Sequence, residues 1–301
     1  FGGKKVGLIG TGSTGIQIVP VVAEEAEKLF VFQRTPSFTL PMRNSKIDAE
    51  FWEEVRRNYN SIRESASLSP LGGIRAISTR PYFTLPREQR VALMEDSWKR
   101  GGLAFLGTFG DLLRNAEANE EVAEFVRGKI SAVVDDPDTA ERLKPRGYPI
   151  FARRPCLDTN YYEAFNKAHV HLADCIDDPI ERITPNGIKT EKSEYELDVI
   201  LLATGFDGLT GALLAFDVFG KEGRDLKEKW SGGARSYLGI AMEGFPNMFM
   251  VCGANGPSAL ANIITLNQQT VDWICDAITH MRANDILEME AKTEAEDEWM
   301  D

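Results

Sequence analysis

The amino-acid sequence predicts an α/β fold in which a parallel sheet is interrupted by a long helical insertion. Three observations carry this prediction. A strand, a glycine-rich turn, a helix and a second strand follow one another within residues 4–33. Charged helical patterns fill residues 42–147, and near-continuous apolar strands of the kind buried in α/β sheets return after residue 170. The 301 residues leave room for about two domains.

The N-terminal unit begins with a short apolar strand at residues 4–9, which is followed directly by three glycines with G-x-G-x-x-G spacing. Apolar residues at helical spacing continue to about residue 26, and residues 29–33 supply the second strand. A strand, a helix and a strand within about 30 residues make one unit of a parallel sheet. Residues 4–33 therefore predict the start of a Rossmann-like fold.

Residues 1–41 and 148–202 are expected to form this first domain, with residues 42–147 inserted into it as helices. Residues 203–301 are expected to form part of a second domain. Local patterns indicate further elements, including a hairpin around an Asn-Gly turn. The expected elements are helices at 88–99 and 111–131, strands at 170–172, 180–184, 188–190, 197–202 and 248–251, and a helix at 267–281.

Composition excludes several classes of function. The 34 Lys and Arg against 46 Asp and Glu give a formal net charge of −12, which opposes binding to a nucleic-acid backbone. No apolar run reaches the roughly 18 residues of a membrane span. We therefore expect neither nucleic acid nor a membrane as a partner. The four cysteines form no C-x-x-C pair, a pattern typical of reduced thiols in a cytoplasmic protein.

The glycines Gly10, Gly12 and Gly15 have the strand-to-helix context that a dinucleotide-binding turn requires. The first permits the tight turn, the second lets a pyrophosphate approach the backbone, and the third lets the helix pack closely on the strand. The phosphates would then lie at the N-terminus of the helix. We interpret this turn as a dinucleotide-binding site.

The residues that end the second strand distinguish between dinucleotides. A site for NAD or FAD would place an Asp or Glu there against the ribose 2′-hydroxyl, whereas this chain has Gln33, Arg34 and Thr35. A guanidinium offers forked donors to a 2′-phosphate, and a hydroxyl adds another donor. The sequence therefore favours NADPH over NADH.

Two later segments indicate further parts of a cofactor site. The strand that ends at residues 203–205 is similar to the second nucleotide-associated turn of flavoprotein oxidoreductases that bind two dinucleotides. Arg153 and Arg154 are adjacent in an otherwise apolar, proline-bounded segment, residues 148–155. On an extended segment the two side chains point to opposite sides, so one could reach a cofactor phosphate while the other faces the reaction centre.

Other chemistries lack their motifs. No Tyr is followed four residues later by a Lys, as a short-chain dehydrogenase would require, and no G-x-S-x-G is present. His169 and His171 could share one face of a strand, but no third ligand motif accompanies them. We expect no metal site.

Taken in order, these motifs resemble those of the FAD- and NADPH-dependent Baeyer-Villiger monooxygenases. The segments that carry the resemblance include G-T-G-S-T-G-I-Q, F-Q-R-T-P, R-R-P and A-T-G-F-D. Residues 257–262 look more like the phenylacetone type than the cyclohexanone type. The resemblance implies part of a second, FAD-type dinucleotide-binding domain, and an enzyme that uses NADPH and O2 to convert ketones to esters or lactones.

The resemblance also implies roles for single residues. Residues 11–17 would hold the pyrophosphate, and Arg153, together with Arg34 and Thr35, the 2′-phosphate. Arg154 would be the catalytic arginine, because its permanent charge can stabilise negative charge at the flavin. The implied cofactor-binding residues are Gly10, Thr11, Gly12, Ser13, Thr14, Gly15, Ile16, Gln17, Arg34, Thr35, Ala152, Arg153, Thr204, Gly205 and Ile263, and the implied substrate-pocket residues are Ser258, Ala259 and Leu260.

The family's FAD-binding glycine turn and its F-x-G-x-x-x-H-x-x-x-W-P fingerprint would precede Phe1. The chain is therefore expected to be the central and C-terminal portion of a longer protein, which supplies the NADPH site and the catalytic arginine without tight flavin binding of its own. Two alternatives stay open. One is a flavin monooxygenase that oxygenates nitrogen or sulfur, which should lack the Arg153-Arg154-Pro155 segment. The other is a non-catalytic NADPH-binding module.

Overall fold

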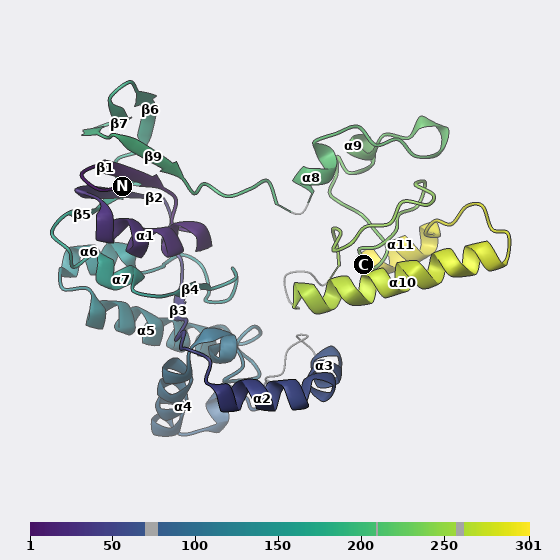
Figure 1. The fold of residues 1–301 in the computed structure, drawn as a ribbon, viewed down its shortest axis with the longest axis horizontal. Coiled ribbons are helices and arrows are strands. Elements are labelled where there is room, and N and C mark those ends of the chain that lie inside the picture. The colour runs from purple at the N-terminus through teal and green to yellow at the C-terminus, as the bar shows by residue number, and fades with distance from the viewer. Residues whose placement is uncertain (70–77, 209, 257–261) are drawn as a thin grey trace. The chain divides into compact units, whose positions relative to one another are not determined.

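The chain forms two compact units in the computed structural model (Figure 1). The first unit comprises Phe1–Lys46 and Ala76–Gly205, and the second comprises Ile47–Arg75 and Phe206–Asp301. Each unit has its own clusters of buried apolar side chains. The structure describes residues 1–69, 78–208, 210–256 and 262–301.

A four-stranded parallel sheet forms the centre of the first unit. Ile9 of β1 lies opposite both Phe32 of β2 and Leu202 of β9, so the carboxyl ends of these strands share one edge. Helix α1 (Ser13–Glu25) connects β1 to β2, and its buried side chains pack in the main cluster with Val6 and Leu8. The predicted strand–helix–strand unit is confirmed. In spatial order the strands are β5 (Val170–Asp174), β2 (Lys28–Gln33), β1 (Lys5–Ile9) and β9 (Val199–Leu202).

The insertion is helical, as predicted, and much of it packs around a second cluster. Helix α5 begins after Asn115, whose side-chain oxygen accepts a hydrogen bond from the Ala118 amide at 3.2 Å. Val122 and Val126 on its inner face are fully buried in the cluster that contains Phe105. The helices of this region are α4 (Arg87–Arg100), η2 (Gly102–Phe105), α5 (Ala116–Val133) and α6 (Pro137–Leu143), preceded by η1 (Tyr82–Thr84).

The remaining elements of the first unit flank the sheet. The predicted hairpin is confirmed, with Ile183 opposite Ile188 across the Asn-Gly turn. A short parallel pair, β3 with β4, brings the segment after β2 beside the segment that follows the insertion. These elements are β3 (Thr39–Pro41), β4 (Cys156–Asp158), α7 (Tyr161–Ala164), β6 (Ile180–Thr184), β7 (Gly187–Thr190) and β8 (Glu194–Glu196).

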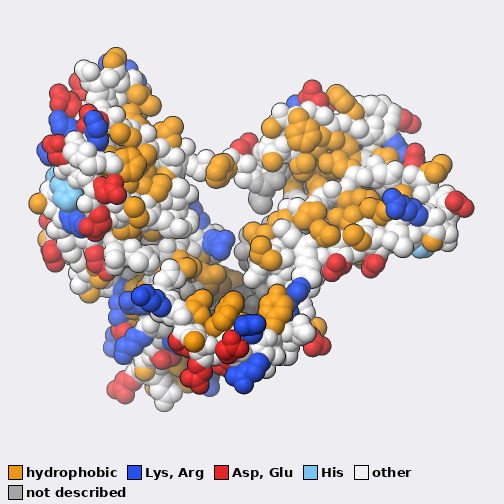
Figure 2. All heavy atoms as spheres, viewed as in Figure 1, with side chains coloured by type: hydrophobic (Ala, Val, Ile, Leu, Met, Phe, Trp, Pro, Cys, Tyr) orange, Lys and Arg blue, Asp and Glu red, His pale blue; other side chains and the backbone are white. Residues whose placement is uncertain are grey.

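The second unit consists of helices and long loops in its described part. Its core cluster contains Trp230, Met242, Phe245 and Met250. The long helix α10 carries exposed apolar side chains along its surface, Ile264 among them (Figure 2). None of the described helices is long and apolar enough to cross a membrane. The helices of this unit are α2 (Ala49–Arg57), α3 (Tyr59–Ser67), α8 (Gly211–Leu214), η3 (Lys221–Gly223), α9 (Leu226–Lys229), α10 (Ile263–Ala283) and α11 (Thr293–Met300).

Two expectations differ from the structure. The strand predicted at 248–251 is wrong: the Met250 amide donates to the Ile240 carbonyl at 2.8 Å, but no strand lies beside this segment in the described chain. Met248 and Met250 of this loop pack in the core cluster, whereas Val251 is 47% exposed. Residues 47–75 are grouped with the second unit rather than with the other helices of the insertion. Arg63 of α3 donates a hydrogen bond to Gln268 of α10, which links the two helices.

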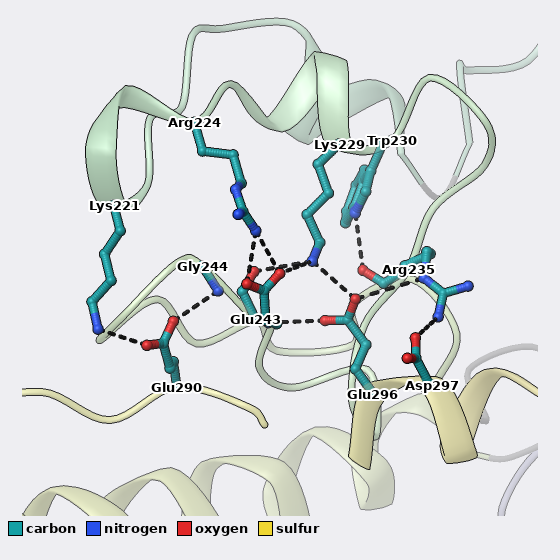
Figure 3. Close-up of polar contacts among 10 residues, drawn as sticks. All are labelled: Lys221, Arg224, Lys229, Trp230, Arg235, Glu243, Gly244, Glu290, Glu296 and Asp297. Carbon is teal, nitrogen blue, oxygen red and sulfur yellow. Dashed lines mark hydrogen bonds and ion pairs between the residues drawn. The ribbon is translucent and has the colours of Figure 1, made fainter. Parts of the chain in front are cut away.

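A network of charged side chains ties the last helix to the loops of the second unit (Figure 3). Lys229 Nζ lies 2.9 Å from Glu296 Oε1 and 3.1 Å from Glu243 Oε2. The other carboxylate oxygen of Glu296 accepts a hydrogen bond from the Glu243 amide at 2.9 Å. The Glu296 side chain is only 4% exposed and that of Lys229 only 10% exposed. Because a buried charge is unfavourable without a partner of opposite charge, each of the two residues stabilises the other. Arg235 adds an ion pair to Asp297 on the same helix.

This network predicts that Glu296→Ala destabilises the second unit by about 2–4 kcal/mol, because it leaves the Lys229 ammonium partly unpaired in a buried place. Urea unfolding followed by tryptophan fluorescence measures the change. The matched control is Glu298→Ala, an exposed residue of the same helix, which should alter the free energy of unfolding by less than about 0.5 kcal/mol. Equal stability of the two variants would contradict the role of Glu296.

Candidate functional site

The glycine turn between β1 and α1 is shaped by two very close backbone contacts. Gly10 has φ +109°, and a Cβ atom added to it would lie 2.3 Å from the Ala203 carbonyl oxygen. A Cβ atom added to Gly15 would lie 2.0 Å from the Gly10 carbonyl oxygen. Around Gly12, by contrast, no heavy atom of the described chain lies within 4 Å of such a position. The first and third glycines thus serve packing, and the second leaves open space.

The N-terminus of α1 faces this open space without a side-chain cap. Gly12 is the N-cap residue, so it offers no side-chain oxygen, and the first turn of the helix holds no acidic residue. The Ser13 hydroxyl instead accepts a hydrogen bond from Gln17 Nε2 at 3.2 Å. Uncapped amides and the helix dipole together attract anions. This end of α1 therefore has the geometry of a phosphate site.

The segment after β2 is hydrogen-bonded to the glycine turn. Thr11, which is 5% exposed, donates from its hydroxyl to the Thr35 carbonyl at 3.1 Å. Gln33 is buried and donates from Nε2 to the Arg142 carbonyl at 2.8 Å. The Arg34 side chain is exposed and has neither a hydrogen bond nor an ion pair within the described residues. A guanidinium free to bind an anion thus lies in the segment that is tied to the turn.

Tyr148 links Arg153, at the far end of the insertion, to the same segment. Residues 149–153 form a turn, with the Ala152 amide donating to the Pro149 carbonyl at 3.2 Å, rather than the extended segment expected from the sequence. The Arg153 guanidinium lies over the Tyr148 ring, 4.7 Å from the ring centroid. Tyr148 donates from its hydroxyl to the Pro36 carbonyl at 2.8 Å. Through Tyr148, these contacts connect Arg153 to the segment that contains Arg34.

Arg154 follows as an exposed side chain just before the buried Pro155 and β4. It has no hydrogen bond or ion pair among the residues that the structure describes. Burial raises the pKa of the neighbouring Cys156 thiol, an effect that the charge of Arg154 opposes. The side chain is therefore a free cation close to the end of the turn that carries Arg153.

The loop after β9 completes this edge of the sheet. The Ala203 amide donates to the Ile9 carbonyl at 2.8 Å, which holds the start of the loop against the glycine turn. Gly205 has φ +90°, a conformation that favours glycine, and Thr204 is exposed. The carboxyl-terminal edge of a parallel sheet is where ligands bind in folds of this type. The glycine turn, the segment that follows β2 and the start of the loop after β9 are thus joined at one edge of the sheet.

Other predicted site residues belong to the second unit or lie outside the described residues. Ile263 belongs to the second unit, where it is 42% exposed at the start of α10. The predicted substrate-pocket residues 258–260 lie outside the described residues. Among the described residues no group of His, Cys, Asp and Glu could hold a metal ion. His169 instead contacts the Ala23 carbonyl, and His171 stacks on Phe30.

Tyr148 contacts Arg153 but was not among the site residues predicted from the sequence. It is the first residue of the segment 148–155, which contains the two arginines. Nothing local indicated that its hydroxyl would reach Pro36, which is 112 residues away along the chain. The aromatic residue beside paired arginines was the available signal.

Comparison with known proteins gives relatives over nearly the whole chain. No family model matches it. The cyclohexanone 1,2-monooxygenase of Acinetobacter sp. is 39% identical over 302 residues, which cover 99% of this chain and 55% of that protein. A Baeyer-Villiger monooxygenase of Pseudooceanicola batsensis is 38% identical over 99% of this chain and 54% of its own length. A phenazine N-monooxygenase of Lysobacter antibioticus is 35% identical over 99% of this chain and 55% of its own length.

Solved structures agree with these relatives. The structure of OTEMO in complex with FAD and NADP superimposes with a TM-score of 0.96 at 38% identity, covering 99% of this chain and 56% of that one. An oxidized steroid monooxygenase bound to NADP has a TM-score of 0.95 at 41% identity, covering 99% of this chain and 57% of that one. The chain spans a little over half the length of the relatives it matches. Over almost its entire length, this chain is thus a homologue of the Baeyer-Villiger monooxygenases.

Proposed function

We propose that the first unit binds NADPH and that the protein to which the chain belongs is a FAD- and NADPH-dependent Baeyer-Villiger monooxygenase. Such an enzyme would use O2 to convert a ketone to an ester or lactone. One observation carries the proposal: the open, uncapped end of α1 at Gly12 belongs to a turn that is hydrogen-bonded to the segment of Arg34, and Tyr148 links that segment to Arg153. Neither guanidinium has an ion pair among the described residues. The homologues and the NADP-bound structures support the proposal.

The pyrophosphate is assigned to the glycine turn. Residues 11–17 would surround it, with backbone amides of the first turn of α1 donating to the phosphate oxygens. The space around Gly12 fits this assignment, because a side chain there would fill the position that the phosphates need. Thr204 and Gly205 line the neighbouring loop of the same sheet edge.

The 2′-phosphate is assigned to Arg34, Thr35 and Arg153. Two guanidinium groups present many N–H donors to a dianion, and no carboxylate occupies the end of β2 to repel it. The ribose hydroxyl of NADH would leave these cations without a partner. The arrangement therefore supports selectivity for NADPH.

Arg154 is assigned the catalytic role. When bound, FAD supplies the oxygen chemistry, and the protein supplies position and charge. A guanidinium combines a positive charge with several N–H donors, so Arg154 can stabilise negative charge that develops in the reaction. We assign Ile263 to the flavin side of the site and residues 258–260 to the ketone pocket. The chain contains one glycine fingerprint, so tight FAD binding is expected to need the longer protein.

Oxygenation of nitrogen is the second candidate function. It is favoured by one observation, the 35% identity with the phenazine N-monooxygenase over 99% of this chain. The full-length protein should be offered cyclohexanone and phenazine side by side with NADPH. A lactone product supports the proposed function, and a phenazine N-oxide alone would replace it.

A cytoplasmic location is also proposed. All four cysteines, Cys156, Cys175, Cys252 and Cys275, are free, as expected where thiols are kept reduced.

The glycine turn predicts opposite effects for two similar substitutions. Gly12→Ala should leave the free energy of unfolding within about 0.5 kcal/mol of the wild type, because its φ of −81° suits alanine and nothing lies nearby. It should nevertheless weaken NADPH binding at least tenfold. Gly15→Ala should destabilise the first unit by more than about 2 kcal/mol through its clash with Gly10. Thermal unfolding and calorimetric titration measure the two effects, and equal stabilities would refute the packing argument.

The phosphate assignment predicts that Arg34→Ala raises the Kd for NADPH about 10- to 100-fold, because it removes charge-assisted hydrogen bonds. The Kd for NADH should change less than threefold. Arg182→Ala in β6 removes the same charge from an exposed place in the same unit and should affect neither cofactor. Parallel losses of NADPH and NADH affinity would contradict the role of Arg34.

The catalytic assignment predicts that Arg154→Ala in the full-length protein lowers kcat for ketone oxygenation at least about 100-fold. The Kd for NADPH should remain within threefold of the wild type, because the assigned phosphate contacts are made by other residues. Arg154→Lys keeps the charge but loses the planar fork, and should recover part of the rate. Unchanged ketone oxygenation by Arg154→Ala would remove this residue from the mechanism.

A further inference from the structure

Tyr148 joins two segments that are far apart in the sequence. Its hydroxyl donates to the Pro36 carbonyl at 2.8 Å, although the two residues are 112 positions apart. Its ring supports the Arg153 guanidinium at 4.7 Å from the ring centroid. One side chain thus contacts both the backbone that follows Arg34 and Thr35 and the side chain of Arg153.

The tyrosine ring is itself held in place by a buried group. Phe38, 3% exposed, meets it edge to face at 5.5 Å between ring centroids. Arg127 lies over Phe38, and its own guanidinium is fixed by Glu120, by Glu124 and by the Pro145 carbonyl. The position of the Tyr148 ring is therefore set by the core of the insertion.

The segment after β2 is held from two sides. The Thr35 carbonyl accepts from Thr11 of the glycine turn, and the Pro36 carbonyl accepts from Tyr148. Burial raises the pKa of Tyr148, so its hydroxyl keeps its proton and remains a donor at neutral pH. The backbone beside Arg34 is thus hydrogen-bonded to Thr11 of the glycine turn on one side and to Tyr148 on the other. The Tyr148 ring in turn lies under Arg153.

The contact with the Tyr148 ring leaves the N–H donors of Arg153 available. A cation–π contact is an attraction between the charge and the ring face and requires none of the N–H groups as hydrogen-bond donors. Arg153 has no hydrogen bond or ion pair with any residue in the described ranges. A side chain whose rotamers are already restricted loses less entropy when an anion binds.

We propose that Tyr148 is a positioning residue for cofactor selectivity: it holds Arg153 and the Arg34 segment in the arrangement that recognises a ribose 2′-phosphate. This inference rests on the proposed binding of NADPH by the first unit. Tyr148 acts through Arg153 and does not itself contact the reacting atoms. Replacing Tyr148 should therefore weaken the binding of NADPH, which carries the 2′-phosphate, and leave the binding of NADH, which has a free 2′-hydroxyl, unchanged.

The test compares Tyr148→Phe and Tyr148→Leu by calorimetric titration with NADPH and NADH. Tyr148→Leu removes the ring beneath Arg153 and should raise the Kd for NADPH about tenfold while leaving the Kd for NADH within twofold. Tyr148→Phe keeps the ring and loses only the bond to Pro36, so the increase should be about threefold or less. A smaller effect of Tyr148→Phe than of Tyr148→Leu would show that the aromatic ring supports Arg153, whereas a general loss of structure would weaken the binding of both cofactors.

A double-mutant cycle with Arg153→Ala sharpens the test. If Tyr148 acts through Arg153, Tyr148→Leu should have little further effect on NADPH affinity once Arg153 is absent. Equal loss of NADPH and NADH affinity, or an undiminished effect of Tyr148→Leu in the Arg153→Ala background, would overturn the inference. Thermal unfolding of each variant identifies any loss of fold. If Tyr148→Leu does not fold, Tyr148→Phe, which keeps the partly buried ring, decides: its Kd for NADPH should rise more than its Kd for NADH, and equal changes would overturn the inference.

The outcome also distinguishes the inference from the function on which it rests. If the wild-type chain itself does not prefer NADPH to NADH, the proposed function fails and the inference fails with it. If Arg34→Ala abolishes the preference and Tyr148→Leu does not alter it, the proposed function stands and only the role of Tyr148 is overturned.

Discussion

The close approach of Gly15 to the Gly10 carbonyl, which leaves no room for a side chain at residue 15, is the constraint on which the candidate site depends. Because no side chain intervenes, α1 packs directly on the end of β1, and Gly10 in turn lies against Ala203 after β9. Thr11, held within this turn, reaches the Thr35 carbonyl after β2. Three separate strand ends are thereby fixed relative to one helix N-terminus. Backbone packing alone thus creates the open, uncapped helix end to which the proposed function assigns the pyrophosphate.

The first unit also carries arginines that have no ion pair. The chain has a formal charge of −12, yet Arg34, Arg153 and Arg154 make no ion pairs with the described residues. In the second unit the opposite arrangement holds, since Lys229 and Glu296 are nearly buried and satisfy each other. Paired charges there hold a helix in place, whereas the unpaired guanidinium groups of the first unit are available to a ligand. Charged side chains thus stabilise the second unit, and the proposed function assigns those of the first unit to recognition.

The sequence predicted what depends on neighbours in the chain. Glycine spacing between two apolar runs was enough for β1, α1 and β2, because turn, helix start and strand end are all local. The strand expected at 248–251 failed, because a four-residue apolar run becomes a strand only beside a partner, which the described structure does not supply. The contact of Tyr148 with Pro36 and the grouping of residues 47–75 with the second unit join segments more than 100 residues apart. Such contacts depend on tertiary packing and leave no local pattern.

The measurement that tests the account most directly is calorimetric titration of the unmodified chain with NADPH and with NADH, alongside an absorbance scan for bound flavin. The account predicts binding of NADPH at least tenfold tighter than that of NADH, in a preparation that carries no tightly bound flavin. Equal affinity for the two cofactors, or preference for NADH, would contradict the assignment of Arg34 and Arg153 to a 2′-phosphate. Absence of binding by either cofactor would contradict the dinucleotide site itself.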